Sequence, residues 1–219
     1  MISFGISQPL NMTVIASLQM PLYHVVGNHD FSVTADYKEK VYETLGMPSA
    51  YYTKSIGNWE FIFLDTNVIT SYAYIPGSAD HKFYTDLRRE KFPFAKGWNG
   101  GFGDEQLEWL AERLADAESS GRKVALFYHA PAFTEPAPRG GAIDGPALLD
   151  VISRYPDTVK FVLAGHQHDG GYRQIGNTHH LTIKGQIEAD SSTYAIVEIT
   201  DTTVTVSGFG KQESHVWEL

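Results

Sequence analysis

Three clusters of polar side chains, each placed directly after an apolar run, contain the residues best suited to chemistry. The clusters are Asn28–His29–Asp30 in "VVGNHD", His129 in "VALFYHAP", and His166 with His168 in "VKFVLAGHQHDGG". Together they offer an amide oxygen, a carboxylate and several imidazole nitrogens. Such a mixed oxygen and nitrogen set suits manganese, iron or zinc better than calcium, which prefers oxygen ligands alone.

The apolar runs that precede these clusters are predicted to be buried strands. In an α/β fold, the carboxyl ends of neighbouring strands meet at one rim, where ligands usually bind. A single histidine at a strand end is usually an ordinary loop residue, and we interpret His24, His81 and His215 in that way. Three separate clusters with the same placement favour a shared metal site instead.

The remaining pattern predicts alternating helices and strands around these clusters. Residues 34–45 are predicted to form a helix, and residues 51–56 and 59–65 a hairpin around Gly57–Asn58. Residues 68–103 lack clear periodicity and are predicted to form an ordered functional loop. "GDEQLEWLAERLADAESSG" has leucines on one face and predicts an amphipathic helix that ends at Gly121.

The second half continues with a predicted strand, a loop, a short helix and another strand. These are residues 124–128, 131–145, 146–154 and 159–164, in that order. The segment 179–208 is rich in Thr, Val and Ile with alternating polarity, which predicts antiparallel strands.

Length and composition favour one globular domain over residues 1–219. The chain is 42% hydrophobic and 13% aromatic, and no apolar run approaches the length of a membrane span. A formal charge of −9 argues against a nucleic-acid partner, and a phosphate substrate would therefore need a cation. The absence of cysteine excludes disulfides and thiolate metal sites. The first 20 residues lack the pattern of a signal peptide, so we expect a cytoplasmic protein, with its oligomeric state left open.

The motifs "GNHD", "YHAP" and "GHQH" resemble, in order and interval, those of the calcineurin-like metallophosphoesterases. Within that superfamily the stretches "NGGFGDEQLEWL", "GHQHDGGY" and "HHLTIKGQIE" look most like the manganese-dependent ADP-ribose/CDP-alcohol diphosphatases. The resemblance implies a four-layer α-β-β-α sandwich, with two mixed sheets face to face and helices outside. It also implies a hydrolase that cleaves the phosphoanhydride of a small nucleoside diphosphate derivative.

The resemblance assigns roles to individual residues. Asn28, His129 and His166 match ligands of the second metal, and His168 matches a ligand of the first. His29 matches the residue that contacts the substrate phosphate and protonates the leaving oxygen, with Asp30 beside it as an orienting group. The implied cofactor is a pair of divalent cations, most suitably Mn²⁺, with iron or zinc as alternatives.

Other residues were weighed as supporting groups. Tyr172 and Arg173, with aromatic residues between positions 83 and 102, could line a nucleotide pocket by stacking, although such residues often only pack a loop. His179 and His180 could support the site from behind the ligands, or could simply be packed in the fold.

The chain departs from the family at its amino terminus. The family's first strand ends in an Asp motif and its second in "GD", whose Asp bridges both metals, and neither motif is present here. A strand–helix–strand unit of roughly 30 residues or more is therefore missing. Asp65 could replace the lost ligand, but it is more simply read as a strand-end residue that caps its loop.

This loss has three expected consequences. One sheet should be short, with an open edge near residues 23–26. At most one metal ion should be tightly held. The functional alternatives are another phosphodiesterase or phosphomonoesterase of the superfamily, or a catalytically impaired metal- or nucleotide-binding remnant.

Overall fold

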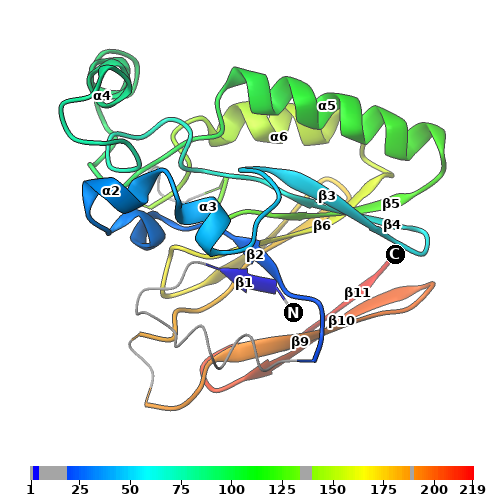
Figure 1. Cartoon of the computed structure of the whole chain (residues 1–219). Helices are drawn as coiled ribbons and strands as arrows, with labels where there is room; N and C mark the ends of the chain where they lie inside the picture. The colour runs from blue at the N-terminus through cyan, green and yellow to red at the C-terminus, as the bar shows by residue number, and fades with distance from the viewer. Residues whose placement is uncertain (1, 5–18, 134–139, 188–189) are drawn as a thin grey trace.

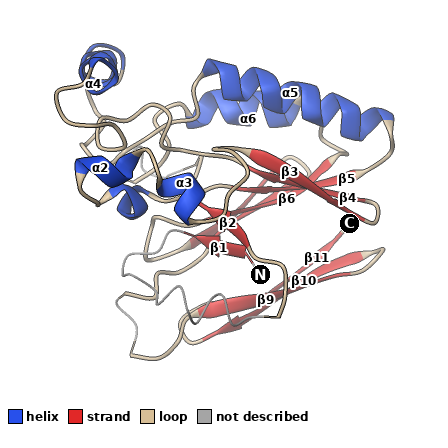
Figure 2. Ribbon diagram, in the orientation of Figure 1, coloured by secondary structure: helices blue, strands red, loops and turns tan. Residues whose placement is uncertain are grey.

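A six-stranded mixed sheet forms the centre of the fold (Figures 1 and 2). The computed structural model describes residues 2–4, 19–133, 140–187 and 190–219, and for residues 2–4 it describes the backbone alone. The strand order is β3-β4-β5-β6-β8-β7. These strands are β3 (Tyr52–Ile56), β4 (Trp59–Phe63), β5 (Lys123–Phe127), β6 (Val159–Ala164), β7 (Gly171–Ile175) and β8 (Thr178–Thr182).

The four central strands are parallel, and the two outer ones are antiparallel to their neighbours. The predicted hairpin of residues 51–65 is confirmed as β3 and β4, joined at Gly57, which has a φ of +57°. Because the ends of β5 and β6 lie side by side, the segments that follow them also meet, and these segments contain His129 and His166.

Helices α5 (Asp104–Ser119) and α6 (Gly145–Ser153) cover one face of this sheet (Figure 1). The leucines of α5 form its buried face, as the sequence pattern predicts, and pack with Leu126, Val162 and Leu148 in one apolar cluster. The carboxylate of Asp144 accepts hydrogen bonds from the backbone N–H groups of Phe102 and Gly103 at the start of α5.

The opposite face is covered by a second layer of strands, which is in two parts. Strands β9 (Tyr194–Ile199), β10 (Thr203–Phe209) and β11 (His215–Glu218) form an antiparallel sheet in the order β11-β10-β9. Strands β1 (Ile2–Phe4) and β2 (Tyr23–Val25) form a separate parallel pair. The second layer therefore departs from the single mixed sheet expected, and β2 has no strand partner among the described residues on its side away from β1.

Several smaller expectations are corrected. The loop predicted over residues 68–103 contains a 13-residue helix, α4 (Ala79–Lys91). The helix predicted over residues 34–45 is two single turns, α2 (Ala35–Lys38) and α3 (Val41–Thr44). In the segment 179–208, β9 and β10 are antiparallel as predicted, whereas β8 is parallel to β6. The amino-terminal segment, where the family's Asp and "GD" motifs are missing, lies largely outside the described residues.

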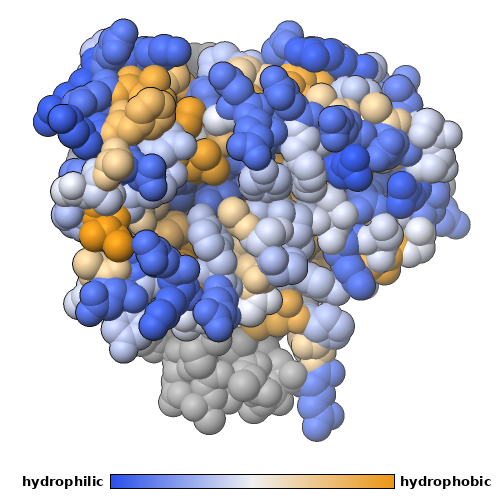
Figure 3. Space-filling view, turned by 45° about the horizontal axis from the view of Figure 1, so that its top comes forward, coloured by the Kyte–Doolittle hydropathy of each residue, from blue (hydrophilic) through white to orange (hydrophobic). Residues whose placement is uncertain are grey.

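The surface is predominantly hydrophilic on the face shown in Figure 3, with apolar side chains in small separate groups. No helix in the described part of the chain is long and apolar enough to cross a membrane.

Candidate active site

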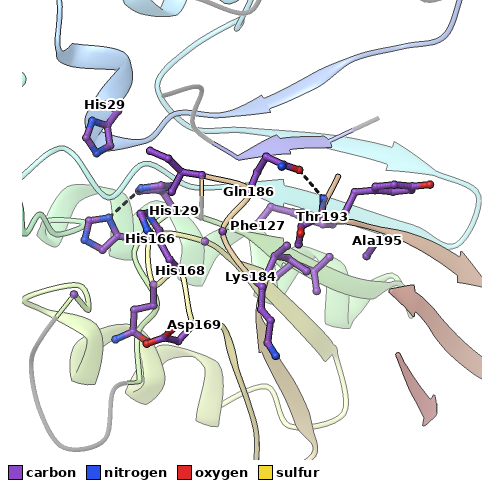
Figure 4. Close-up of a pocket in the computed structure, with 18 of the residues that line it drawn as sticks. His29, Phe127, His129, His166, His168, Asp169, Lys184, Gln186, Thr193 and Ala195 are labelled. Carbon is purple, nitrogen blue, oxygen red and sulfur yellow. Dashed lines mark hydrogen bonds between the residues drawn. The ribbon is translucent and has the colours of Figure 1, made fainter. Parts of the chain in front are cut away.

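The side chains of Asn28, His129 and His166 converge on one point at the ends of β2, β5 and β6. The Oδ1 atom of Asn28 lies 2.9 Å from Nε2 of His129 and 3.2 Å from Nδ1 of His166. The two imidazole nitrogens are 3.1 Å apart, and the two rings lie side by side with an angle of 73° between their planes (Figure 4). The predicted meeting of these three residues is thus observed.

The three facing atoms have the geometry of a metal site. A neutral imidazole has one N–H group and the amide oxygen has none, so hydrogen bonds alone cannot satisfy all three atoms well. Three ligand atoms that surround a metal ion at right angles, each about 2.1 Å from the ion, lie about 3.0 Å from one another. The observed separations match that spacing.

Burial keeps the two imidazoles in the neutral form that binds metals. Burial lowers the pKa of His129 well below its ordinary value, and a charge on His166 lowers it further. Burial also lowers the pKa of His166 to about 4, with smaller contributions from His168 and His29. His29 and His168 line the same cavity as these ligand atoms.

The backbone at His166 is strained in a way that is typical of functional sites. Its φ is +66°, and it is the only residue other than glycine with a positive φ in the described part of the chain. An L-residue adopts this conformation at a free-energy penalty of about 1–2 kcal/mol. The surrounding contacts therefore hold His166 in a position that its own backbone disfavours.

Asp30 fixes the loop that carries Asn28. Its Oδ2 atom accepts a hydrogen bond of 2.7 Å from the N–H of Gly27, and residues 28–31 form one turn of 3-10 helix. The side chain therefore holds the backbone on both sides of Asn28 and His29. His29 is exposed and lines the cavity beside the ligand atoms.

Asp65 stabilises the same loop through hydrogen bonds to Asn67. It is fully buried, and its carboxylate accepts hydrogen bonds from the Tyr42 hydroxyl and from both nitrogens of Asn67. Asn67 in turn donates to the carbonyl oxygen of Val26, two residues before Asn28. This arrangement matches the loop-capping interpretation of Asp65, because both carboxylate oxygens are already occupied.

His168 is held against a close backbone. The N–H of Gly185 donates to the carbonyl oxygen of His168 at 2.8 Å. A methyl group at position 185 would lie only 2.8 Å from Cβ of His168. The stretch "KGQIE" that follows β8 thus fixes the position of this fourth predicted ligand.

The other predicted site residues lie elsewhere. His179 stacks on Trp217 with ring centroids 4.9 Å apart and accepts or donates a hydrogen bond with the Tyr172 hydroxyl. His180 points to the opposite face of β8, where it meets the edge of Phe133, and the Arg173 guanidinium lies over that same ring. None of these four is among the described residues that line the cavity, and the nucleotide-stacking role of Tyr172 and Arg173 and the supporting role of His180 stay predictions.

The cavity has a volume of about 1670 Å³ and extends from the histidines into the space between the two layers of strands. Its inner wall is apolar and comes from both layers: Phe61, Phe127, Phe161, Leu163, Ile183 and Val197. The described residues that line the cavity also include Lys96 and Trp98. Sequence reasoning missed Lys96, because residues 92–99 have no periodicity, and included Trp98 only in a broad group of aromatics.

Known proteins of similar sequence include several diphosphatases. The chain is 28% identical to the mouse manganese-dependent ADP-ribose/CDP-alcohol diphosphatase, over 96% of this chain and 72% of the mouse protein. The Arabidopsis thaliana protein of the same name is 26% identical over 90% of this chain and 70% of that protein. A 3',5'-cyclic-nucleotide phosphodiesterase of Nostoc is 30% identical over 82% of this chain and 58% of that protein.

The fold is shared with a dimetal phosphatase from Danio rerio, with a TM-score of 0.81 at 22% identity, over 94% of this chain and 74% of that one. The sequence model of the calcineurin-like phosphoesterases matches residues 6–170, which include every ligand candidate described above. The chain belongs to the calcineurin-like phosphoesterases, a family of hydrolases.

Proposed function

We propose that this chain is a metal-dependent hydrolase of nucleoside diphosphate derivatives such as ADP-ribose or CDP-alcohols. It would cleave the phosphoanhydride bond to give a nucleoside monophosphate and a phosphorylated sugar or alcohol. The observation that carries the proposal is the convergence of Asn28, His129 and His166 within 3.2 Å of one another, at the rim of a cavity. The diphosphatase names of the most similar relatives support the substrate class.

Asn28, His129 and His166 would hold the cation, with His168 as the ligand candidate for a second one. The amide and imidazole donors suit Mn²⁺, and also iron or zinc. A divalent cation bound there polarises a phosphoryl oxygen and lowers the pKa of a water molecule. We propose one tightly held ion per chain, because the bridging carboxylate of the family is missing.

The protein's own groups would position the substrate and handle the proton. His29 is exposed and lines the cavity, and its proposed role is to contact a phosphoryl oxygen and to donate a proton to the leaving oxygen. Asp30 holds this turn through the Gly27 N–H, so that His29 faces the ligand atoms from a fixed backbone. The neutral His129 and His166 add no positive charge of their own, which leaves the cation as the main electrostatic partner of an anionic substrate.

The direct test is hydrolysis of ADP-ribose and CDP-choline by the purified chain with added Mn²⁺, alongside the His29→Ala and His129→Ala variants. We expect slow hydrolysis of both substrates, because one cation cannot stabilise both the attacking and the leaving oxygen. Each substitution should lower the rate by about 100-fold or more. Cleavage of simple phosphomonoesters but of neither diphosphate would contradict the proposed substrate class.

A cyclic-nucleotide phosphodiesterase is the second candidate, since the Nostoc relative of that name is 30% identical over 82% of the chain. It would use the same ligand atoms. Assay of 3',5'-cyclic AMP under the same conditions separates the two, because only this second function predicts that the cyclic nucleotide is the faster substrate. A chain that binds Mn²⁺ and cleaves none of these compounds would be the metal-binding remnant.

A further inference from the structure

The turn formed by residues 96–99 carries two cavity-lining side chains suited to a nucleotide. Lys96 and Trp98 line the same cavity as His29 and His166. The Trp98 side chain is one of the most exposed large apolar groups of the described residues, at 54% of its full accessibility. An exposed indole that lines a cavity with metal-ligand candidates is available to contact a ligand there.

The turn itself is rigidly built around Asn99, which is 1% exposed. The Oδ1 atom of Asn99 accepts a hydrogen bond from the Lys96 N–H at 2.8 Å, and its Nδ2 donates to the carbonyl oxygen of Gly141 at 3.1 Å. The neighbouring Gly140 lies against the ring of His166, since a methyl group at position 140 would be 3.6 Å from Cδ2 of that ring. One end of the turn is therefore tied to the segment that packs on a ligand candidate.

The residue that follows the turn is tied to the other ligand-bearing loop. Gly100 packs so tightly on the end of β4 that a methyl group there would lie 2.0 Å from the carbonyl oxygen of Thr66. The Thr66 hydroxyl accepts a hydrogen bond of 3.2 Å from the N–H of Ala130, directly after His129. Trp98 is thus an exposed aromatic ring on backbone that is anchored to the loops of both His129 and His166.

Lys96 adds a positive charge at this point of an otherwise acidic protein. Its side chain is exposed, and no carboxylate of the described residues forms an ion pair with it. A cavity lined by both an ammonium group and an exposed aromatic ring offers what a nucleotide needs, because its phosphate is anionic and its base presents a flat π surface.

We propose that residues 96–99 form the subsite for the nucleoside end of the substrate. The Trp98 indole stacks on the base, and the Lys96 ammonium contacts the phosphate next to the nucleoside. Because every base has a π face, stacking discriminates weakly among bases, and the subsite accepts adenine and cytosine alike. This inference rests on the proposed function and names the group that recognises its substrate class.

The test is the binding of AMP and CMP, measured by titration calorimetry with Mn²⁺ present, so that no turnover is required. Ribose 5-phosphate, which has no base, is the third probe. Trp98→Ala should weaken the binding of AMP and of CMP by a similar factor, about tenfold or more. It should leave the binding of ribose 5-phosphate unchanged. Trp98→Phe should retain most of the affinity. Phe94→Ala is the matched control, because Phe94 is an exposed aromatic of the same loop that does not line the cavity.

Lys96→Gln tests the second contact and should weaken the binding of all three probes equally. Lys91→Gln, at the end of α4, should change the binding of none of them. The proposal is overturned if the unsubstituted chain does not bind AMP, or if Trp98→Ala binds AMP with unchanged affinity. It is also overturned if Trp98→Ala weakens the binding of ribose 5-phosphate as much as that of AMP. Base-dependent binding by a chain that hydrolyses neither ADP-ribose nor CDP-choline would support the subsite and contradict the proposed function.

Discussion

The Oδ1 atom of Asn28 and the Nε2 atom of His129 lie 2.9 Å apart, although 101 residues separate them in the sequence. The contact joins the end of β2, in the second layer, to the end of β5, in the central sheet. It therefore depends on the two layers being correctly packed. Metal binding at this point and stability of the fold should be coupled, because an ion that binds only the folded chain stabilises it.

The first prediction concerns the strain at His166. His166→Gly and His166→Ala both remove the imidazole, but only glycine adopts a φ of +66° without penalty. In EDTA, the glycine variant should have a free energy of unfolding about 0.5–1 kcal/mol higher than the alanine variant, as measured by urea denaturation. Neither should bind Mn²⁺ tightly. Equal stability of the two variants would show that the backbone relaxes when the imidazole is removed.

The second prediction concerns the contact between Gly185 and His168. A methyl group at position 185 would lie 2.8–3.0 Å from Cβ, Cγ and Cα of His168, so Gly185→Ala must displace that segment. It should lower the free energy of unfolding by about 1–3 kcal/mol and reduce hydrolysis. Gly171→Ala is the control, because nothing lies within 4 Å of the added methyl group. Similar effects of both substitutions on stability and rate would argue against a fixed His168.

The third prediction concerns the pH dependence of stability that arises from Asp65. Burial raises the pKa of this carboxyl to about 6, although hydrogen bonds from Tyr42 and Asn67 oppose the effect. The folded chain therefore binds a proton more tightly than the unfolded chain, whose Asp has a pKa of 3.8. The contribution of Asp65 to stability is greatest below pH 4 and falls as the pH rises through 6, by about 3 kcal/mol in total.

The measurement is urea denaturation of the original chain and of Asp65→Asn between pH 4 and pH 7.5, in EDTA. Asparagine does not titrate, so the stability of the original chain should fall relative to that of the variant as the pH rises. A difference that is constant across this range would mean that the carboxylate stays ionised throughout.

The fourth prediction concerns the edge of β9, which pairs with β10 alone among the described strands. Strand β9 ends the three-stranded sheet, and its Tyr194 and Ile196 side chains are about half exposed. Unpaired apolar edges associate, and a charge placed on them suppresses association. We expect the chain to self-associate at high concentration in sedimentation velocity, and Ile196→Lys to reduce this. Phe83→Lys, on helix α4, adds the same charge away from any strand and should have no effect. A stable, sharply melting monomer at all concentrations would contradict the expectation.

The convergence of Asn28, His129 and His166 could be predicted because each cluster follows a buried strand, and the direction of a parallel strand fixes which rim its end reaches. Helix α4 was not predicted, since none of its residues is fully buried and its packed face, with Tyr84 and Leu87, is only partly covered. The only local signal was Ser78, whose hydroxyl caps the helix by accepting from the His81 N–H. The ring contacts of Tyr172, His179 and His180 could not be predicted, because their partners, His215, Trp217 and Phe133, come from distant segments. The division of the second layer likewise depends on packing between strands far apart in the chain.

The fifth and most direct test is the manganese content of the purified chain. Protein dialysed after purification with Mn²⁺ should contain about one ion per chain by elemental analysis, since Asn28, His129 and His166 supply one set of three converging donors. His129→Ala should lose this ion, and His81→Ala, on helix α4, should retain it. Two tightly held ions per chain, or one ion that persists in His129→Ala, would show that the metal site lies elsewhere or has a ligand outside this set.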